Sequence, residues 1–235
     1  MKIIFICGML EFSSKMDKPN GNEVTKMCMI LNELHNKSAA DLLRDYNKNN
    51  QFPIDVARIA QDIGIQLGSV DFSRIESKDS IKKIVEQKGH ILGAVMSMGE
   101  EVCIMYSNKL SDNSTFKNLT EAEKKEKLLR RQRFTIAHEI GHCCKHLSSH
   151  GDVINVEYRT DQRDYSEGSR EREANIFAGE LLIPLNYLLD YCIGKGNVIS
   201  IQMLSDVFRV SHHVMEARIN YLSEEGCLPD IQFVM

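Results

Sequence analysis

The chain has 235 residues, of which 43% are hydrophobic and 26% charged, and its formal net charge is −4 at pH 7. This length can bury a full core, as one domain or as one domain with an appendage, and the composition is that of an ordinary globular protein. The slight acidic excess excludes a whole-chain electrostatic footprint for nucleic acid.

The seven cysteines are odd in number and include no CxxC pair. In a chain of this length, that pattern argues against a secreted disulfide scaffold and favours reduced thiols, so we expect a cytoplasmic protein. The opening segment MKIIFICGML is apolar for only about ten residues and no A-x-A cleavage site follows it, which favours a short first strand over a signal peptide. No other segment is long enough to cross a membrane.

Residues 11–22 are polar and typical of a linker. We therefore divide the chain into an N-terminal extension of unknown role, residues 1–25, and a single domain, residues 26–235. The apolar spacing over residues 23–46 predicts one or two helices.

The segment PIDVARIAQDIG, residues 53–64, predicts a short helix, because Val56, Ile59 and Ala60 share one face and Gly64 can end it. The segment IQLGSV that follows predicts a strand. The segments ILGAVMS and VCIMYS, on either side of MGEE, are rich in β-branched and apolar residues and predict a hairpin.

Thr120 and Glu123 form a capping-box pattern that opens a long helix, which we expect to run to about Lys145. Residues 147–168 are expected to be irregular. A second long helix follows Ser169.

This second helix must end or kink by Pro184. In the tail, residues 198–222 fit two short helices joined at Val210-Ser211, which resembles a helix-turn-helix.

The pentapeptide HEIGH, from His138 to His142, is an HExxH motif. On a helix, residues i and i+4 lie about 40° apart and about 6 Å along the axis, so both imidazoles can bind one ion. Zinc accepts histidine nitrogens, and Glu139 lies beside the ion, where a general base is needed. The alternative, a buried amphipathic helix with two satisfied histidines, remains open at this point.

The other metal-binding residue types nearby are poorly placed. His146 is about 12 Å from His138 along the axis, so it cannot share an ion with both motif histidines. No glycine follows His142 to break the helix, as a metzincin site requires. Cys143 and Cys144 point about 100° and 200° away from His142, and we expect them to be packing residues.

A third ligand is predicted on the second helix, in REREANIFAGELLIP. Glu171 lies about 50° from the middle of the apolar stripe and Glu173 about 110° from it. An inward carboxylate is unfavourable unless it is paired or bound to a metal, whereas the alternative for Glu171 is an ordinary first-turn glutamate. Asn175 also faces inward and can orient a liganding histidine.

The segment RFTIAHEIGHCCKH followed by EREANIFAGELLIP resembles the ImmA/IrrE family of zinc-dependent endopeptidases. PIDVARIAQDIGIQL and the tail LSDVFRVSHHVMEARINYL resemble further segments of that family, so the similarity spans residues 30–222. It implies one zinc per chain, bound by His138, His142 and Glu171, with Glu139 as the catalytic base. It also implies an α+β, mainly helical zincin-like fold, with a small sheet or hairpin beside the HExxH helix and a C-terminal helical pair.

The resemblance further implies hydrolysis of a peptide bond in a protein substrate, expected to be a helix-turn-helix transcriptional repressor, often one encoded beside the protease on a mobile element. The predicted strand VCIMYSN could bind substrate by strand addition at its edge. Tyr158, Tyr165 and His150 are the candidates for stabilising the oxyanion.

Two alternatives remain. The first is a non-catalytic zinc-containing regulator that binds DNA or a repressor through its C-terminal helices; the acidic residues of the tail make direct DNA binding the weaker expectation. The second is a relative that folds but does not cut, against which the intact Glu139 argues. Two histidines and a carboxylate also suit divalent ions other than zinc.

Overall fold

The computed structural model describes residues 28–76, 86, 90–98, 100–110, 116, 118–147, 155–160, 169–193, 195, 198–229 and 231–234. Of residues 74, 75, 98 and 155–160 it describes the backbone alone. The predicted first strand, the linker at residues 11–22 and the extension at residues 1–25 lie outside the described residues. The division of the chain at residue 25 therefore stays a prediction.

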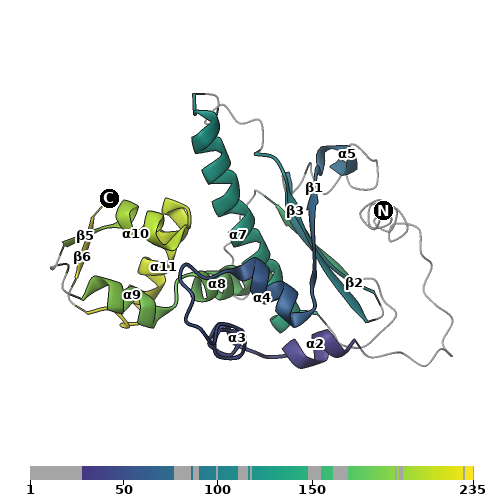
Figure 1. The fold of residues 1–235 in the computed structure, drawn as a ribbon, viewed down its shortest axis with the longest axis horizontal. Coiled ribbons are helices and arrows are strands. Elements are labelled where there is room, and N and C mark those ends of the chain that lie inside the picture. The colour runs from purple at the N-terminus through teal and green to yellow at the C-terminus, as the bar shows by residue number, and fades with distance from the viewer. Residues whose placement is uncertain are drawn as a thin grey trace.

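A four-stranded mixed sheet stands on one side of the molecule (Figure 1). Its spatial order is β1-β3-β2-β4, formed by Gln66–Val70 (β1), Glu101–Ser107 (β3), Ile91–Met98 (β2) and Asn155–Thr160 (β4). β1 runs parallel to β3, whereas β2 pairs antiparallel with both β3 and β4. The predicted hairpin is confirmed.

Two expectations about this sheet were wrong. The strand β3, proposed above as a substrate-binding edge, is an inner strand because β1 and β2 occupy both of its sides. Residues 147–168, expected to be irregular, include the edge strand β4 at 155–160. The partner of β4 lies some sixty residues earlier in the chain, and local sequence patterns do not report such long-range pairing.

The long central helix α7 spans Glu121–Lys145, as predicted. The side chain of Thr120 accepts a hydrogen bond from the backbone of Glu123, and the Glu123 carboxylate accepts one from the backbone N–H of Thr120, so the predicted capping box is present. The helix is buried from Thr135 to Cys144, where it packs against β2 and β3 on one side and a second helix, α8, on the other.

The second helix, α8, spans Arg170–Leu182 and begins at the N-cap Ser169, whose hydroxyl accepts a hydrogen bond from the backbone N–H of Arg172. It ends before Pro184, as predicted. A further helix that the sequence did not predict, α9, follows at Leu185–Cys192.

Smaller helices pack against α7 and α8. They are α2 (Met29–Leu34), α3 (Ala39–Tyr46) and α4 (Val56–Ile63), with α5 (Ser73–Glu76) beside the sheet. The predicted end of α4 is confirmed, because Gly64 has a φ of 98°, a left-handed conformation that glycine adopts without strain.

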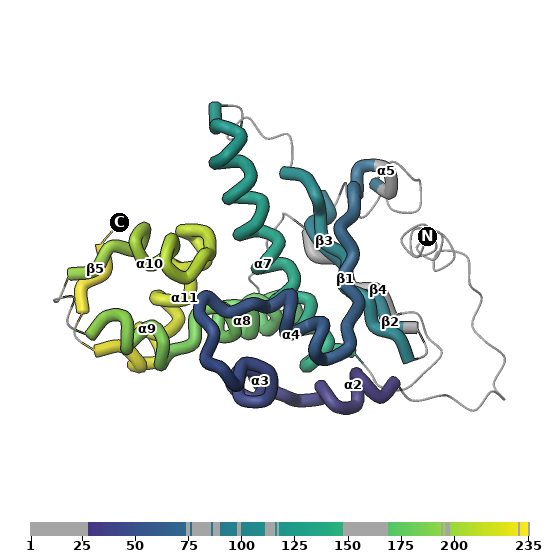
Figure 2. The backbone as a smooth tube through the Cα atoms, in the orientation of Figure 1, coloured from purple at the N-terminus to yellow at the C-terminus, as the bar shows by residue number. Residues whose placement is uncertain are grey.

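The C-terminal elements gather on the side of α7 opposite the four-stranded sheet (Figures 1 and 2). They include α10 (Ile201–Phe208), α11 (His212–Glu224) and a parallel pair of short strands, β5 (Val198–Ser200) and β6 (Gln232–Val234). The two predicted tail helices are thus present. Arg130 of α7 holds their connection, donating to the carbonyl oxygen of Val210 over 2.9 Å and to the carboxylate of Asp206 over 2.8 Å.

One apolar cluster runs from α2 through α7 and α8 to α11, so all these helices share a core. Within the described part of the chain, none of the helices combines the length and apolar character that a bilayer crossing requires. The protein has the predicted α+β, mainly helical zincin-like fold.

Candidate metal centre

His138 and His142 lie one turn apart on the buried half of α7, with 0% and 1% of their surface exposed. Their Nε2 atoms are 3.0 Å apart. Glu171, in the first turn of α8, reaches across with Oε2 3.3 Å from Nε2 of His138 and Oε1 3.2 Å from Nε2 of His142. The structure therefore brings together the three side chains that the sequence proposed as ligands.

This geometry fits a divalent metal ion. One ligand atom from each of the three residues lies within 4.8 Å of the others, and two imidazoles with one carboxylate form a common donor set for catalytic metals. The histidines are buried, while the side chain of Glu171 is 31% exposed. The site could therefore hold an ion that is reached from the side of Glu171.

The charge of Glu171 is favoured where it lies. Burial alone would raise the pKa of this carboxyl, but its hydrogen bonds with His138 and His142 outweigh burial and hold the pKa well below its ordinary value. Glu171 is thus an anion facing two imidazoles, and the same arrangement attracts a cation.

Asn175 takes the supporting position that its helix face predicted. Its Oδ1 lies 3.0 Å from Nδ1 of His138, so Nδ1–H donates to the amide oxygen and Nε2 of His138 is left facing the site. Cys143 and Cys144 are fully buried packing residues, as expected. Burial raises the pKa of Cys143 well above its ordinary value, which keeps this thiol protonated and unreactive.

His146 lies beside the site and, as predicted, is not among the three clustered residues. Its Nδ1 is 2.9 Å from Nδ1 of His142, and its Nε2 is 2.9 Å from Oε2 of Glu173. The sequence treated Glu173 only as an outward-facing contrast to Glu171. Helical periodicity could not have found its contact, because Glu173 is more than half exposed and its partner lies on another helix.

Glu139 is completely buried and faces strand β2. In β2 it lies beside Gly93, where an added Cβ would be 2.2 Å from Cγ2 of Thr135 and 3.0 Å from Oε1 of Glu139. Both distances are shorter than ordinary van der Waals contact. A residue without a side chain therefore lets the sheet approach α7 directly beside the candidate base.

A second glycine permits the close approach of α8. A Cβ on Gly141, within the HExxH motif, would lie 3.2 Å from the side chain of Phe177 and 3.3 Å from Cα of Ala174. Gly141 thus sets how near the first turn of α8, which carries Glu171, can come to the two histidines.

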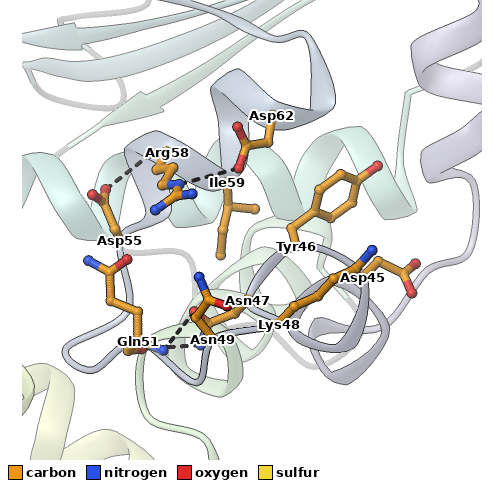
Figure 3. A pocket seen from close by; sticks show the side chains of 10 residues that line it. All are labelled: Asp45, Tyr46, Asn47, Lys48, Asn49, Gln51, Asp55, Arg58, Ile59 and Asp62. Carbon is orange, nitrogen blue, oxygen red and sulfur yellow. Dashed lines mark hydrogen bonds and ion pairs between the residues drawn. The ribbon is translucent and has the colours of Figure 1, made fainter.

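A polar pocket of about 430 Å³ lies elsewhere, between α3 and α4 (Figure 3). Three of its charged groups form ion pairs: Asp62 with Arg58, and Asp45 with Lys37 and Arg44. None of the three clustered residues lines this pocket.

The candidates for oxyanion stabilisation stay predictions. Tyr165 and His150 lie outside the described residues, and Tyr158 is described only by its backbone, in β4.

The described geometry agrees with a comparison to known protein families. Residues 115–220 match a peptidase family whose model is described as the IrrE N-terminal-like domain. This range contains the whole of α7 and α8, and so the entire metal cluster. A search of curated proteins finds no match. The family resemblance seen in the sequence is thus confirmed over residues 115–220, which are similar to the IrrE N-terminal-like domain of that peptidase family.

Proposed function

We propose that the protein is a zinc-dependent endopeptidase that hydrolyses a peptide bond in a protein substrate. The observation that carries this proposal is the buried carboxylate of Glu139 beside a cluster of two histidines and one glutamate. A structural zinc site is closed by four protein ligands, whereas a catalytic site has three and leaves one position for water or substrate. Among the described residues the cluster offers three.

The chain's own residues would divide the work as follows. His138, His142 and Glu171 hold the ion, which when bound supplies Lewis-acid chemistry to the scissile carbonyl and to the attacking water. A carboxylate oxygen of Glu139 accepts a proton from that water and then donates it to the amine nitrogen that leaves.

The substrate would bind as an added strand along β4. β4 is at the edge of the sheet, and its residue Arg159 pairs with Gly93 of β2. Gly93 lies beside Glu139, so the part of β4 that pairs with Gly93 is one strand away from the candidate base. An extended peptide that pairs with the backbone of β4 would therefore pass close to the ion.

For the substrate we propose a helix-turn-helix transcriptional repressor met in the cytoplasm, as the family resemblance implies. The six described cysteines are free thiols, which supports a reducing compartment. The alternative of DNA binding through α11 has less support. Arg218, one of the few cations of the tail, is only 7% exposed and lies 3.6 Å from the carboxylate of Glu180, so it cannot reach a phosphate.

The test is co-expression of the chain with candidate repressors encoded near it, comparing the wild type with Glu139→Gln. We expect the wild type to cleave one repressor, and Glu139→Gln to bind zinc as well as the wild type while cleavage falls by at least about 100-fold. Metal content is measured on the purified proteins.

Glu180→Gln is the matched control, since it removes a carboxylate from the other end of α8 and should leave cleavage intact. Full cleavage by Glu139→Gln would refute the mechanism. A chain that cleaves no repressor but shifts operator DNA in a gel would favour the regulatory alternative.

A further inference from the structure

The side of His142 that faces away from the cluster takes part in a hydrogen-bonded path. Nδ1 of His142 lies 2.9 Å from Nδ1 of His146, and Nε2 of His146 lies 2.9 Å from Oε2 of Glu173. We call this path the His146 bridge. It connects a candidate ligand on α7 to the first turn of α8.

The protons of the His146 bridge can be assigned from donor and acceptor chemistry. If Nε2 of His142 faces an ion, its proton is on Nδ1, and that N–H must donate to a lone pair. The facing Nδ1 of His146 is then unprotonated, so the proton of a neutral His146 lies on Nε2. This N–H in turn donates to the carboxylate of Glu173, and every contact in the path is satisfied.

His146 is held in place by the end of α7 and by the packing around it. It is the C-cap residue of α7, and its backbone N–H donates to the carbonyl oxygen of His142 over 2.8 Å. Its side chain is only 5% exposed, whereas that of Glu173 is 54% exposed. The imidazole is therefore held mainly by packing and by the end of the helix, with Glu173 as a partner at the surface.

We propose that His146 is a positioning residue of the metal centre. It accepts the Nδ1–H of His142 and so keeps Nε2 of that ring directed at the ion, just as Asn175 does for His138. Glu173 fixes the tautomer of His146. The inference rests on the proposed metal site. It gives three residues near the start of α8 separate roles: Glu171 binds the ion, Glu173 supports His146, and Asn175 supports His138.

The experiment measures zinc affinity of the full-length protein by competition with a chromogenic chelator. The informative pair is His146→Phe, which keeps a ring but has no acceptor, and His146→Gln, which retains an acceptor oxygen. We expect His146→Phe to weaken zinc binding by about 10–100-fold, the range found when a partner of a liganding histidine is lost, and His146→Gln to recover part of it.

Glu173→Gln should weaken binding less than His146→Phe, because water can replace a partner that is half exposed. Lys145→Ala, an exposed neighbour on the same helix, is the control and should bind zinc like the wild type. Unfolding temperatures of the metal-free proteins show whether any variant has lost its fold. If His146→Phe does not fold, the zinc affinities of His146→Gln and Glu173→Gln test the proposal instead.

A spectroscopic readout separates positioning from mere packing. In histidine-labelled, zinc-loaded wild type, long-range proton–nitrogen spectra should show His142 protonated on Nδ1 and His146 on Nε2. A proton on Nδ1 of His146, or wild-type zinc affinity in His146→Phe, would overturn the proposal, as would a wild type that binds no zinc.

These outcomes are independent of the peptidase proposal. Zinc binding weakened in His146→Phe without any cleavage by the wild type would refute the protease and leave the His146 bridge standing. Cleavage by the wild type together with unchanged zinc affinity in His146→Phe would support the protease and refute the role of the His146 bridge.

Discussion

Three histidines of one helix have different environments, and hydrogen bonding decides what each can do. His138 and His142 turn Nε2 toward each other and toward Glu171, whereas His146 turns toward Glu173. His138 and His142 are four residues apart, and so are His142 and His146. His146 is nevertheless at the end of the helix, one turn beyond the point where a ring can reach the shared ion.

Glu171 is the residue on which metal binding should depend most strongly among the acidic side chains of α8. Glu171→Gln keeps the shape but removes the charge that faces both imidazoles. We expect zinc affinity to fall by more than about 100-fold, the upper range for residues that only support a ligand. The measurement is equilibrium dialysis against buffered zinc.

Glu180→Gln, a change at the far end of the same helix, is the control and should bind zinc normally. Equal loss of zinc in both variants would mean that Glu171 acts through the stability of α8 rather than as a ligand.

At the scale of elements, the site depends on how closely three of them approach one another. β2 meets α7 at Gly93, and α8 meets α7 at Gly141. An added methyl group would overlap Thr135 at Gly93, and at Gly141 it would make tight contacts with Phe177 and Ala174. The buried half of α7 is therefore held between two close contacts at glycines, and both lie beside candidate site residues.

Under the proposed function, Gly93→Ala should reduce cleavage by displacing Glu139. The new methyl group would lie 2.2 Å from Cγ2 of Thr135 and 3.0 Å from Oε1 of Glu139, so β2 or α7 must shift. Overpacking of this kind destabilises a protein by about 1–3 kcal/mol. We expect a lower unfolding temperature and a fall in kcat larger than the change in KM, measured on a cleaved repressor.

Gly68→Ala is the matched control in the same sheet, because a Cβ there would lie 3.7 Å from Cγ of Met105, an ordinary contact. It should be close to neutral. A Gly93→Ala enzyme with full kcat would show that Glu139 does not need this approach of the sheet.

Across the whole molecule, the candidate ligands join two helices that share one core. The ion would bind both α7 and α8, and α8 in turn contacts α3 and α11. On the other side, Arg130 connects α7 to the turn between α10 and α11. Binding at the cluster should therefore stabilise the packing of the entire domain rather than one loop.

Removing the metal should lower the unfolding temperature of the wild type. An ion present at about 100 times its dissociation constant stabilises the folded state by about 2.7 kcal/mol, which corresponds to about 5–10 °C for a domain of this size. Calorimetry with added zinc and with a chelator measures the difference. His142→Ala should show no zinc-dependent shift, and a shift as large as that of the wild type would place the stabilising ion elsewhere.

Much of the site follows from local geometry. The HExxH spacing, the capping box at Thr120 and the inward face of Glu171 and Asn175 depend only on helical periodicity, which a short segment carries by itself. From these patterns the sequence predicted α7, α8 and the three side chains that the structure brings together.

The tertiary structure alone decided the rest, because it depends on contacts between residues far apart in the chain. The sequence did not predict that β4 forms the edge beside the site or that β3 lies inside the sheet, since strand order is set by pairing across long loops. It did not show that Gly93 adjoins Glu139, or that Glu173 reaches His146. Helical periodicity determines which way a side chain points, whereas the assembled core determines what it meets there.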